Sequence, residues 1–175
     1  MPKGFCLFDV PLLYKFSNAS KSSPDFDLRT IYDSTLVASK PANAITLVQN
    51  HDTQPGQSLY AEIKDFFKPL AYALILLRKE GHPLVFYGDL YGISGPPPYK
   101  SGPVKGLTQL MLARKLYAHG SQSSYWDHPN CIGWVRQGGH GKAIGCAVVM
   151  SNAGETEKKM SVGRIHAKEV WTDVV

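Results

Sequence analysis

The feature that most limits how this chain can fold is an alternation of short apolar segments with helical ones over its first 119 residues. Residues 44–48 are predicted to form a buried strand because they are short and rich in β-branched residues, and residues 84–87 and 4–10 are similar runs. Apolar spacing predicts helices over 59–79, with a kink or a new start at Pro69, and over 107–117. Parallel strands joined by helices indicate an α/β fold.

The pattern changes near Gly120. Short alternating runs separated by Gly-rich or Asn-Gly turns follow, at residues 131–135, 143–150, 158–162 and 169–174. This predicts an antiparallel β-module and two domains, 1–119 and 120–175. Before it, residues 17–27 form a polar stretch rich in Ser, Asn, Lys and Asp, and residues 27–35 are expected to hold at most a short helix.

The composition excludes several classes of protein. An apolar fraction of 43% is too high for a disordered chain, and the apolar run 70–77 is far shorter than the roughly 20 residues that a membrane helix needs. The net charge is +5, but Lys and Arg do not cluster, so no nucleic-acid partner is predicted. Cys6, Cys131 and Cys146 lack metal-ligand spacing and are interpreted as free thiols of a cytoplasmic protein.

The number of β/α units is too small for a closed fold. A closed parallel barrel takes roughly eight units and about 250 residues, and an open sheet of three strands would leave both edges unpaired. We therefore expect the chain to be a piece of a longer protein.

The residues best placed for chemistry are Asn50, His51 and Asp52, which follow the predicted strand 44–48. Ligands of parallel α/β folds bind at the carboxyl ends of the strands. A carboxylate there accepts hydrogen bonds from sugar hydroxyls and stabilises developing positive charge. The alternative is that Asp52 or Thr53 caps a following helix and His51 is an ordinary loop residue.

Other polar residues are interpreted as structural or carry no motif. Asp89 also follows a predicted strand and is expected to act as a cap, and Asp9 is expected to stabilise a turn before Pro11. The glycines at 138–141 are expected to form a turn and not a phosphate-binding loop. The six histidines lie far apart, which does not favour a zinc site.

Two runs together carry a resemblance to a known family. Residues 50–54 (Asn-His-Asp-Thr-Gln), with residues 86–89 (Phe-Tyr-Gly-Asp) behind them, resemble the alpha-amylase family of glycoside hydrolases, most closely its bacterial liquefying and intracellular fungal types. Residues 8–12, 67–73 and 132–134 match as well. Either of the two runs alone would be a weaker signal than the pair in this order and at this separation.

The resemblance implies a fold and an activity. Residues 4–10, 44–48 and 81–89 would be strands six, seven and eight of a (β/α)8 TIM barrel, and residues 120–175 would begin an incomplete antiparallel β-sandwich. The parent enzyme would hydrolyse internal α-1,4-glucosidic bonds of starch or glycogen with retention. Asp52 would be the catalytic carboxylate that grips the sugar and supports the transition state, His51 would bind the same sugar, and Asn50 would shape the site.

The resemblance also shows what the chain lacks. Retaining hydrolysis uses a nucleophile and an acid/base carboxylate about 5 Å apart. The family carries these on strands four and five, and neither motif occurs in this sequence. We therefore expect the isolated chain to be inactive towards its α-glucan partner. The alternative is a non-catalytic amylase-like protein that binds glucan or another chain.

The resemblance implies calcium in a full-length relative. Liquefying members hold an ion between barrel and sandwich with carboxylates and backbone carbonyls. Asn130 and Asn152 stand where the family has carboxylates. Because neutral amides bind calcium more weakly, no metal or cofactor is assigned to this chain.

Overall fold

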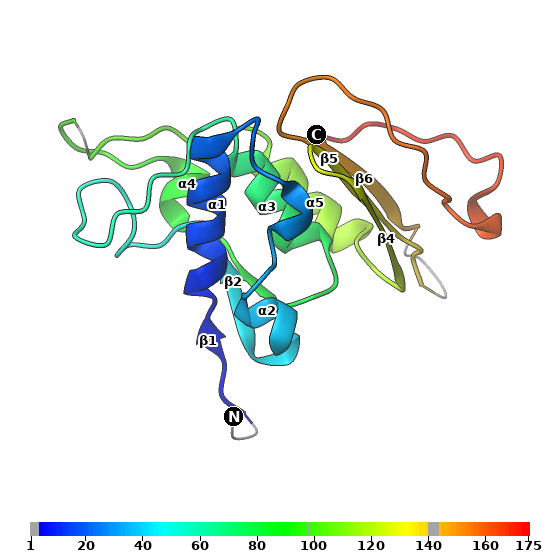
Figure 1. Cartoon of the computed structure of the whole chain (residues 1–175), viewed down its shortest axis with the longest axis horizontal. Coiled ribbons are helices and arrows are strands. Elements are labelled where there is room, and N and C mark those ends of the chain that lie inside the picture. Colours follow the sequence, from blue (N-terminus) through cyan, green and yellow to red (C-terminus); the bar gives the residue numbers. More distant parts are fainter. Residues whose placement is uncertain (1–3, 98, 140–143) are drawn as a thin grey trace.

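Two separate sheets organise the chain (Figure 1). The computed structural model describes residues 4–97, 99–139 and 144–175. The first sheet is parallel, in the order β1 (Leu7–Phe8), β2 (Ala44–Leu47), β3 (His82–Leu84). The second is antiparallel, in the order β4 (Gln122–His128), β5 (Cys131–Arg136), β6 (Cys146–Ser151). The mixed architecture with a parallel sheet followed by an antiparallel one confirms the prediction at this level.

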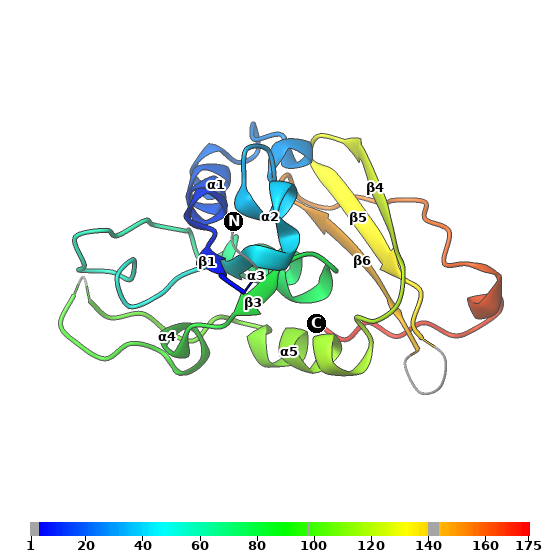
Figure 2. The ribbon, with the colours of Figure 1, turned by 90° about the horizontal axis from the view of Figure 1, so that it is seen from below.

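Helices lie around the parallel sheet and between the two sheets (Figure 2). The α-helices are α1 (Val10–Ser22), α2 (Leu36–Ser39), α3 (Lys68–Leu77), α4 (Tyr87–Tyr91) and α5 (Leu107–Leu116). Short 3-10 helices are η1 (Leu28–Thr30), η2 (Pro41–Asn43) and η3 (Arg164–His166). Among the described residues, no helix is long and apolar enough to span a bilayer.

Helix α3 is buried on nearly all of its sides by neighbouring helices and strands. Eight of its 10 residues are buried, as expected for a helix without a polar face. A single cluster of buried apolar side chains runs from α1 through α3 and α5 into β5. Trp134 of β5 is fully buried, and its indole N–H donates to the Leu77 carbonyl at the end of α3, 3.3 Å away. The division at residues 119 and 120 stays a prediction.

Asp9 joins the first two α-helices at the carboxyl end of β1. Its buried carboxylate accepts from the Leu12 amide at 3.2 Å and so caps α1. It also accepts from the amides of Leu36 at 3.1 Å and Val37 at 2.6 Å, in the first turn of α2. The expected structural role of Asp9 is confirmed, although it caps two helices and does not merely stabilise a turn.

The polar stretch 17–27 gave no signal for a helix, yet its first part belongs to α1. Helix α1 continues to Ser22 because the hydroxyls of its inward serines find acceptors and donors. Ser17 donates to the Glu62 carbonyl at 2.6 Å, and Ser20 accepts from the Lys64 amide at 3.2 Å. Composition alone did not separate such a helix from a loop.

The helix predicted over 59–79 begins only at Lys68. Residues 59–67 form turns and extended chain, and Pro69 lies in the first helical turn, where its missing N–H costs nothing. The new-start alternative was therefore correct. The helix predicted over 107–117 is confirmed as α5.

The strand predictions were accurate for the centre of each sheet and less so elsewhere. Strand 4–10 shrinks to β1, and strand 84–87 shifts to β3, since residues from Tyr87 onward form α4. Runs 131–135 and 143–150 correspond to β5 and β6, although residues 140–143 lie outside the described part. Runs 158–162 and 169–174 are not strands, and β4 was not predicted.

Both outer strands of the parallel sheet lack a further partner within the described residues. Large apolar side chains stand exposed at and beside β1, namely Phe5, Leu7, Phe8, Val10 and Tyr14. An unpaired edge with exposed apolar residues is a surface that other strands can pair with.

Candidate functional site

The loop after β2 is held in shape by Asn50. The Asn50 side-chain oxygen accepts from the Asp52 amide, the Thr53 amide and the Thr53 hydroxyl, each at 3.0 Å. In return, the Asn50 amide donates to the Thr53 hydroxyl at 3.0 Å. An asparagine that bonds its own following backbone makes a tight, defined turn. Asn50 therefore shapes the loop that carries His51 and Asp52.

His51 and Asp52 are presented to solvent by that turn. Their side chains are 82% and 58% exposed, and His51 Nε2 lies 3.4 Å from Asp52 Oδ1. No helix begins between them and Lys68, so the alternative in which Asp52 or Thr53 caps a following helix was wrong. The structure brings Asn50, His51 and Asp52 together in one turn at the carboxyl end of the central parallel strand.

A second loop supports the first. The segments after β2 and after α4 extend from the same side of the molecule, away from the antiparallel sheet (Figures 1 and 2). They touch at Gly56, which has φ +88°, and a Cβ added there would lie 1.7 Å from Cδ1 of the Tyr99 ring. Only glycine allows both this backbone conformation and this close approach.

A buried charged pair lies beneath the site loop. Lys68 Nζ donates to Asp89 Oδ1 at 3.0 Å and to Gln49 Oε1 at 3.2 Å, while Gln49 Nε2 donates to the Thr53 carbonyl at 3.2 Å. The Tyr72 hydroxyl donates to Asp89 Oδ2 at 2.7 Å. We call Gln49, Lys68, Tyr72 and Asp89 the buried polar cluster.

The buried polar cluster holds the base of the loop in place through charge interactions and hydrogen bonds as well as through packing. Burial, reinforced by the adjacent Asp89 carboxylate, raises the pKa of Tyr72 far above its ordinary value, so the phenol stays a donor. Asp89 does not cap a helix as expected: its carboxylate is fully buried and accepts from Lys68 and Tyr72. Sequence patterns gave no signal for Lys68 or Gln49, because their pairing is tertiary.

A polar cavity of about 580 Å³ opens beside the cluster. Gln49 and Lys68 line its inner side, and Tyr60, Glu62, Asp65 and Lys100 are among the residues around it. Asn50, His51 and Asp52 do not line this cavity, nor three other cavities in the described part of the chain. The predicted site residues thus lie on an open surface with a polar cavity at the base of their loop.

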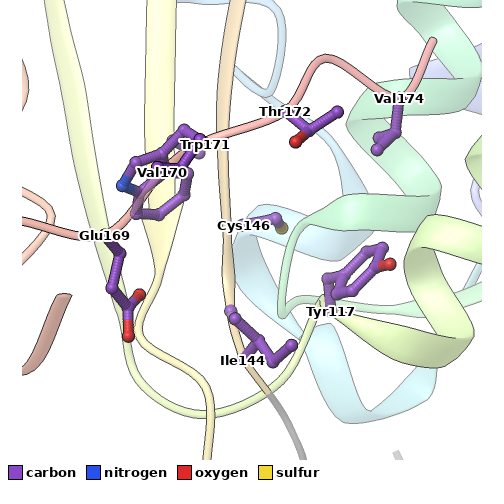
Figure 3. Close-up of a pocket in the computed structure, with 10 residues that line it drawn as sticks. Tyr117, Ile144, Cys146, Glu169, Val170, Trp171, Thr172 and Val174 are labelled. Carbon is purple, nitrogen blue, oxygen red and sulfur yellow. The ribbon is translucent and has the colours of Figure 1, made fainter.

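A different cavity, of about 220 Å³, lies between β6 and the C-terminal segment (Figure 3). Tyr117, Ile144, Cys146 and Trp171 point toward it, and its lining is mostly apolar. Burial raises the pKa of the Cys146 thiol to about 11, which keeps it protonated near neutral pH. This cavity contains none of the predicted site residues and no activated nucleophile.

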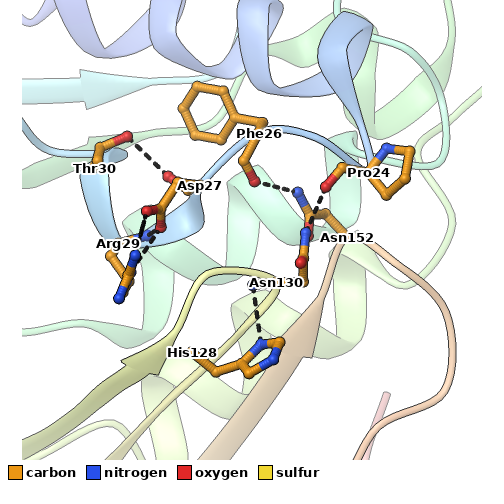
Figure 4. A network of polar contacts seen from close by, with 8 residues as sticks. All are labelled: Pro24, Phe26, Asp27, Arg29, Thr30, His128, Asn130 and Asn152. Atoms are coloured by element: carbon orange, nitrogen blue, oxygen red, sulfur yellow. Dashed lines mark hydrogen bonds and ion pairs between the residues drawn. The ribbon is translucent and has the colours of Figure 1, made fainter.

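Asn130 and Asn152, for which the resemblance implies calcium ligands in relatives, lie in a network of polar contacts with the chain at 24–26 (Figure 4). Asn130 and Asn152 direct their amide nitrogens at the backbone carbonyls of Pro24 and Phe26, respectively. Calcium binds oxygen atoms, so amide hydrogens facing those carbonyls do not suit it. Within the described ranges, no group of three or more His, Cys, Asp or Glu residues is placed to hold a metal.

Comparison with known proteins gives clear sequence relatives. No protein-family model matches the chain. The chain is 46% identical over 175 residues to the cytoplasmic alpha-amylase of Escherichia coli (strain K12), covering 95% of this chain and 35% of that protein. It is 45% identical over 171 residues to the glucan 1,4-alpha-maltohexaosidase of Bacillus sp. (strain 707), covering 96% of this chain and 32% of that protein.

Among solved structures, the chain aligns with the ligand-free cyclic alpha-maltosyl-(1→6)-maltose hydrolase of Arthrobacter globiformis. The alignment has a TM-score of 0.44 at 25% identity and covers 74% of this chain and 33% of that one.

These relatives place the chain among homologues of glycoside hydrolases. More particularly, the chain belongs to the alpha-amylase family and corresponds to a part of an alpha-amylase. It spans about a third of the length of the relatives that it matches.

Proposed function

We propose that this chain supplies part of the substrate-binding and catalytic site of an alpha-amylase. The whole enzyme hydrolyses internal α-1,4-glucosidic bonds with retention. Asp52 holds sugar hydroxyls at the cleaved bond and stabilises the positive charge that develops there. His51 binds the same sugar, and Asn50 holds the turn that carries both residues. The substrate is an α-glucan polysaccharide or oligosaccharide.

One observation carries the proposal. In a chain 46% identical to an alpha-amylase, an acidic side chain that is 58% exposed stands at the end of the central parallel strand, on a turn fixed by Asn50. An exposed carboxylate beside an imidazole is able to accept hydrogen bonds from sugar hydroxyls without first breaking contacts that hold the fold together.

The proposed place in the fold follows from the same relationship. The parallel order β1-β2-β3 agrees with the last three β/α units of a (β/α)8 barrel, and the antiparallel sheet agrees with the start of a β-sandwich. The unpaired edges of β1 and β3 would meet neighbouring barrel strands. A cytoplasmic location is proposed from the free cysteines and from the name of the Escherichia coli relative.

The chain is proposed to be inactive alone because the motifs that carry the nucleophile and the acid/base carboxylate in the family do not occur in its sequence. The test grafts the chain into the Escherichia coli cytoplasmic alpha-amylase in place of the segment that it matches. We expect the graft to release reducing sugar from starch and the 175-residue chain to release none. Asp52→Asn in the graft should lower kcat by about 100- to 1,000-fold, the loss typical of removing one charge-stabilising group.

Asp33→Asn is the matched control because Asp33 is exposed, and among the described residues its carboxylate has no hydrogen-bond or ion-pair partner. It should leave kcat of the graft unchanged. A folded graft that keeps full activity with Asp52→Asn would refute the role of Asp52. Reducing sugar released by the isolated chain would refute the expectation that the reacting carboxylates lie elsewhere.

The second candidate function is a non-catalytic glucan-binding or interaction protein, favoured by the absence of the two reacting carboxylates from the sequence. Starch pull-down with the 175-residue chain separates the candidates. Retention that Asp52→Asn abolishes, together with a folded but inactive graft, would favour binding over catalysis.

A further inference from the structure

Two asparagines connect the antiparallel sheet to the chain between α1 and η1 (Figure 4). Asn130 lies in the turn between β4 and β5, and Asn152 follows β6 directly. Both reach the segment 24–26, which precedes them by more than 100 residues in sequence. The contacts therefore join parts of the chain that lie far apart in the sequence.

The two side chains form a closed set of hydrogen bonds. Asn130 Nδ2 donates to the Pro24 carbonyl at 2.5 Å and to Asn152 Oδ1 at 3.0 Å. Asn152 Nδ2 donates to the Phe26 carbonyl at 2.8 Å. The backbone adds a bond at the same place, from the Asn152 amide to the Asn130 carbonyl at 3.3 Å. We call Asn130 and Asn152 the asparagine pair.

The chemistry of this set opposes a cation. Calcium is held by six to eight oxygen atoms, and its affinity rises with the number of negative ligands. Here the backbone carbonyls of Pro24 and Phe26 each already accept a hydrogen bond from a side-chain amide. The partial positive charge on that amide hydrogen takes the place that an ion would occupy. Turning both amides round would expose oxygens without adding negative charge and would break the hydrogen bonds. The residues therefore do not fit the ion that the family implies.

Within the asparagine pair, Asn152 is protected from water, whereas Asn130 is half-buried. Asn152 is only 8% exposed, and next to it the Leu28 amide donates to the Pro129 carbonyl at 2.7 Å. A buried hydrogen bond stabilises the fold more than an exposed one, because a buried polar group without a partner cannot bind water instead. Each amide nitrogen of the pair already has an acceptor, so the junction needs no ion to hold the two segments together.

We propose that the asparagine pair replaces a calcium ion at the junction of the antiparallel sheet with segment 24–26, so that this junction is independent of metal. The two amides perform with hydrogen bonds what an ion performs with oxygen ligands. A direct consequence is that two carboxylates at these positions would gather four oxygens around one point and create a calcium requirement.

The test measures hydrogen–deuterium exchange of the full 175-residue chain by mass spectrometry, in EDTA and in excess calcium chloride. The readout is local, over residues 24–30 and 128–132, so calcium bound elsewhere does not confuse it. We expect no effect of calcium on the wild-type chain. Asn130→Asp/Asn152→Asp in EDTA should raise exchange over these segments roughly tenfold, because three hydrogen bonds are lost and two charges face carbonyl oxygens.

Calcium added to this double variant should restore the protection. At about 100 times the dissociation constant, it should also raise the melting temperature by roughly 5 to 10 °C. The matched control is Asn18→Asp/Gln109→Glu, which adds the same charge at two exposed positions. It should respond neither to EDTA nor to calcium.

Two results would overturn the proposal. One is slower exchange of the wild-type segments in calcium that Asn130→Ala/Asn152→Ala abolishes, which would mean that the asparagines bind the ion. The other is a folded double aspartate variant that calcium does not protect, which would mean that the four oxygens do not converge. If the double variant does not fold, the wild-type chain and the single variant Asn152→Asp, read in the same way, decide the question.

Discussion

The Lys68 ammonium and the Asp89 carboxylate lie 3.0 Å apart with side chains 7% and 0% exposed, and they tie the start of α3 to α4 beneath the loop that carries Asp52. A buried ion pair is stable only when the remaining polar atoms are also satisfied. Here Gln49 and Tyr72 complete the hydrogen bonding of the two charged groups. The pair therefore specifies where the base of the site loop lies.

The first prediction concerns the charge balance of this pair. Asp89→Asn should lower the free energy of unfolding by about 3 to 5 kcal/mol, because it leaves Lys68 charged and uncompensated in the core. Lys68→Met/Asp89→Asn should cost less than Asp89→Asn alone, since no buried charge remains and the amide oxygen still accepts from Tyr72. Urea denaturation followed by circular dichroism measures both. Asp33→Asn is the exposed control and should change stability by less than about 0.5 kcal/mol. A double variant that is as destabilised as Asp89→Asn, or more so, would contradict the interpretation.

The second prediction concerns the contact between the two projecting loops. Gly56→Ala should displace the Tyr99 ring and raise hydrogen exchange over residues 50–62, because the new Cβ overlaps the ring and φ is +88°. Gly154→Ala is the matched control: Gly154 has φ +95°, but no atom lies within 4 Å of an added Cβ, so it reports backbone strain alone. Gly56→Ala/Tyr99→Ala should recover the protection that the overlap removed. Equal effects of the two glycine substitutions would contradict the importance of the contact.

Sequence patterns predicted the parts of the fold that local periodicity determines. Strand β2 and helix α5 were located closely, because a run of β-branched residues and a repeat of three and four residues are visible in any environment. Helix α1 was missed because buried Ser17 and Ser20 look like loop residues until Glu62 and Lys64 are brought against them. Strand β4 was missed because little of it is buried.

The candidate site shows the same limit. The turn of Asn50, His51 and Asp52 was predictable, because a buried strand must end at a polar edge and parallel strands place such edges together. The buried polar cluster beneath it was not, since Lys68 and Asp89 are 21 residues apart and either alone reads as a surface charge. The bonds of Asn130 and Asn152 to segment 24–26 likewise depend on tertiary structure.

The third prediction concerns the open edge of the parallel sheet. The purified chain should self-associate, because β1 has one unpaired side and Leu7 and Phe8 are 51% and 48% exposed. Phe8→Lys should raise the monomer fraction in sedimentation velocity, since a lysine at an edge opposes strand pairing. Leu112→Lys on α5 is the control, because Leu112 is 54% exposed and lies away from the edge. A monomeric wild-type chain, or an equal effect of Leu112→Lys, would contradict this prediction.

The fourth prediction concerns the pH dependence of the C-terminal segment. His166 Nε2 lies 3.1 Å from the Gln137 carbonyl and Nδ1 lies 2.7 Å from Glu169 Oε2, so the charged ring donates to both and the neutral ring to only one. The hydrogen bond to Gln137, followed by that to Glu169, raises the pKa of His166 above its ordinary 6.5. The stabilisation is therefore fully present below about pH 6.5 and is lost as pH rises through the higher folded pKa. NMR titration should show the raised pKa, and Glu169→Gln should lower it. His166→Gln should remove the fall in the free energy of unfolding over this pH range. The control His119→Gln, at an exposed histidine, should leave that fall unchanged. A His166 resonance that titrates below 6.5 would refute the assignment.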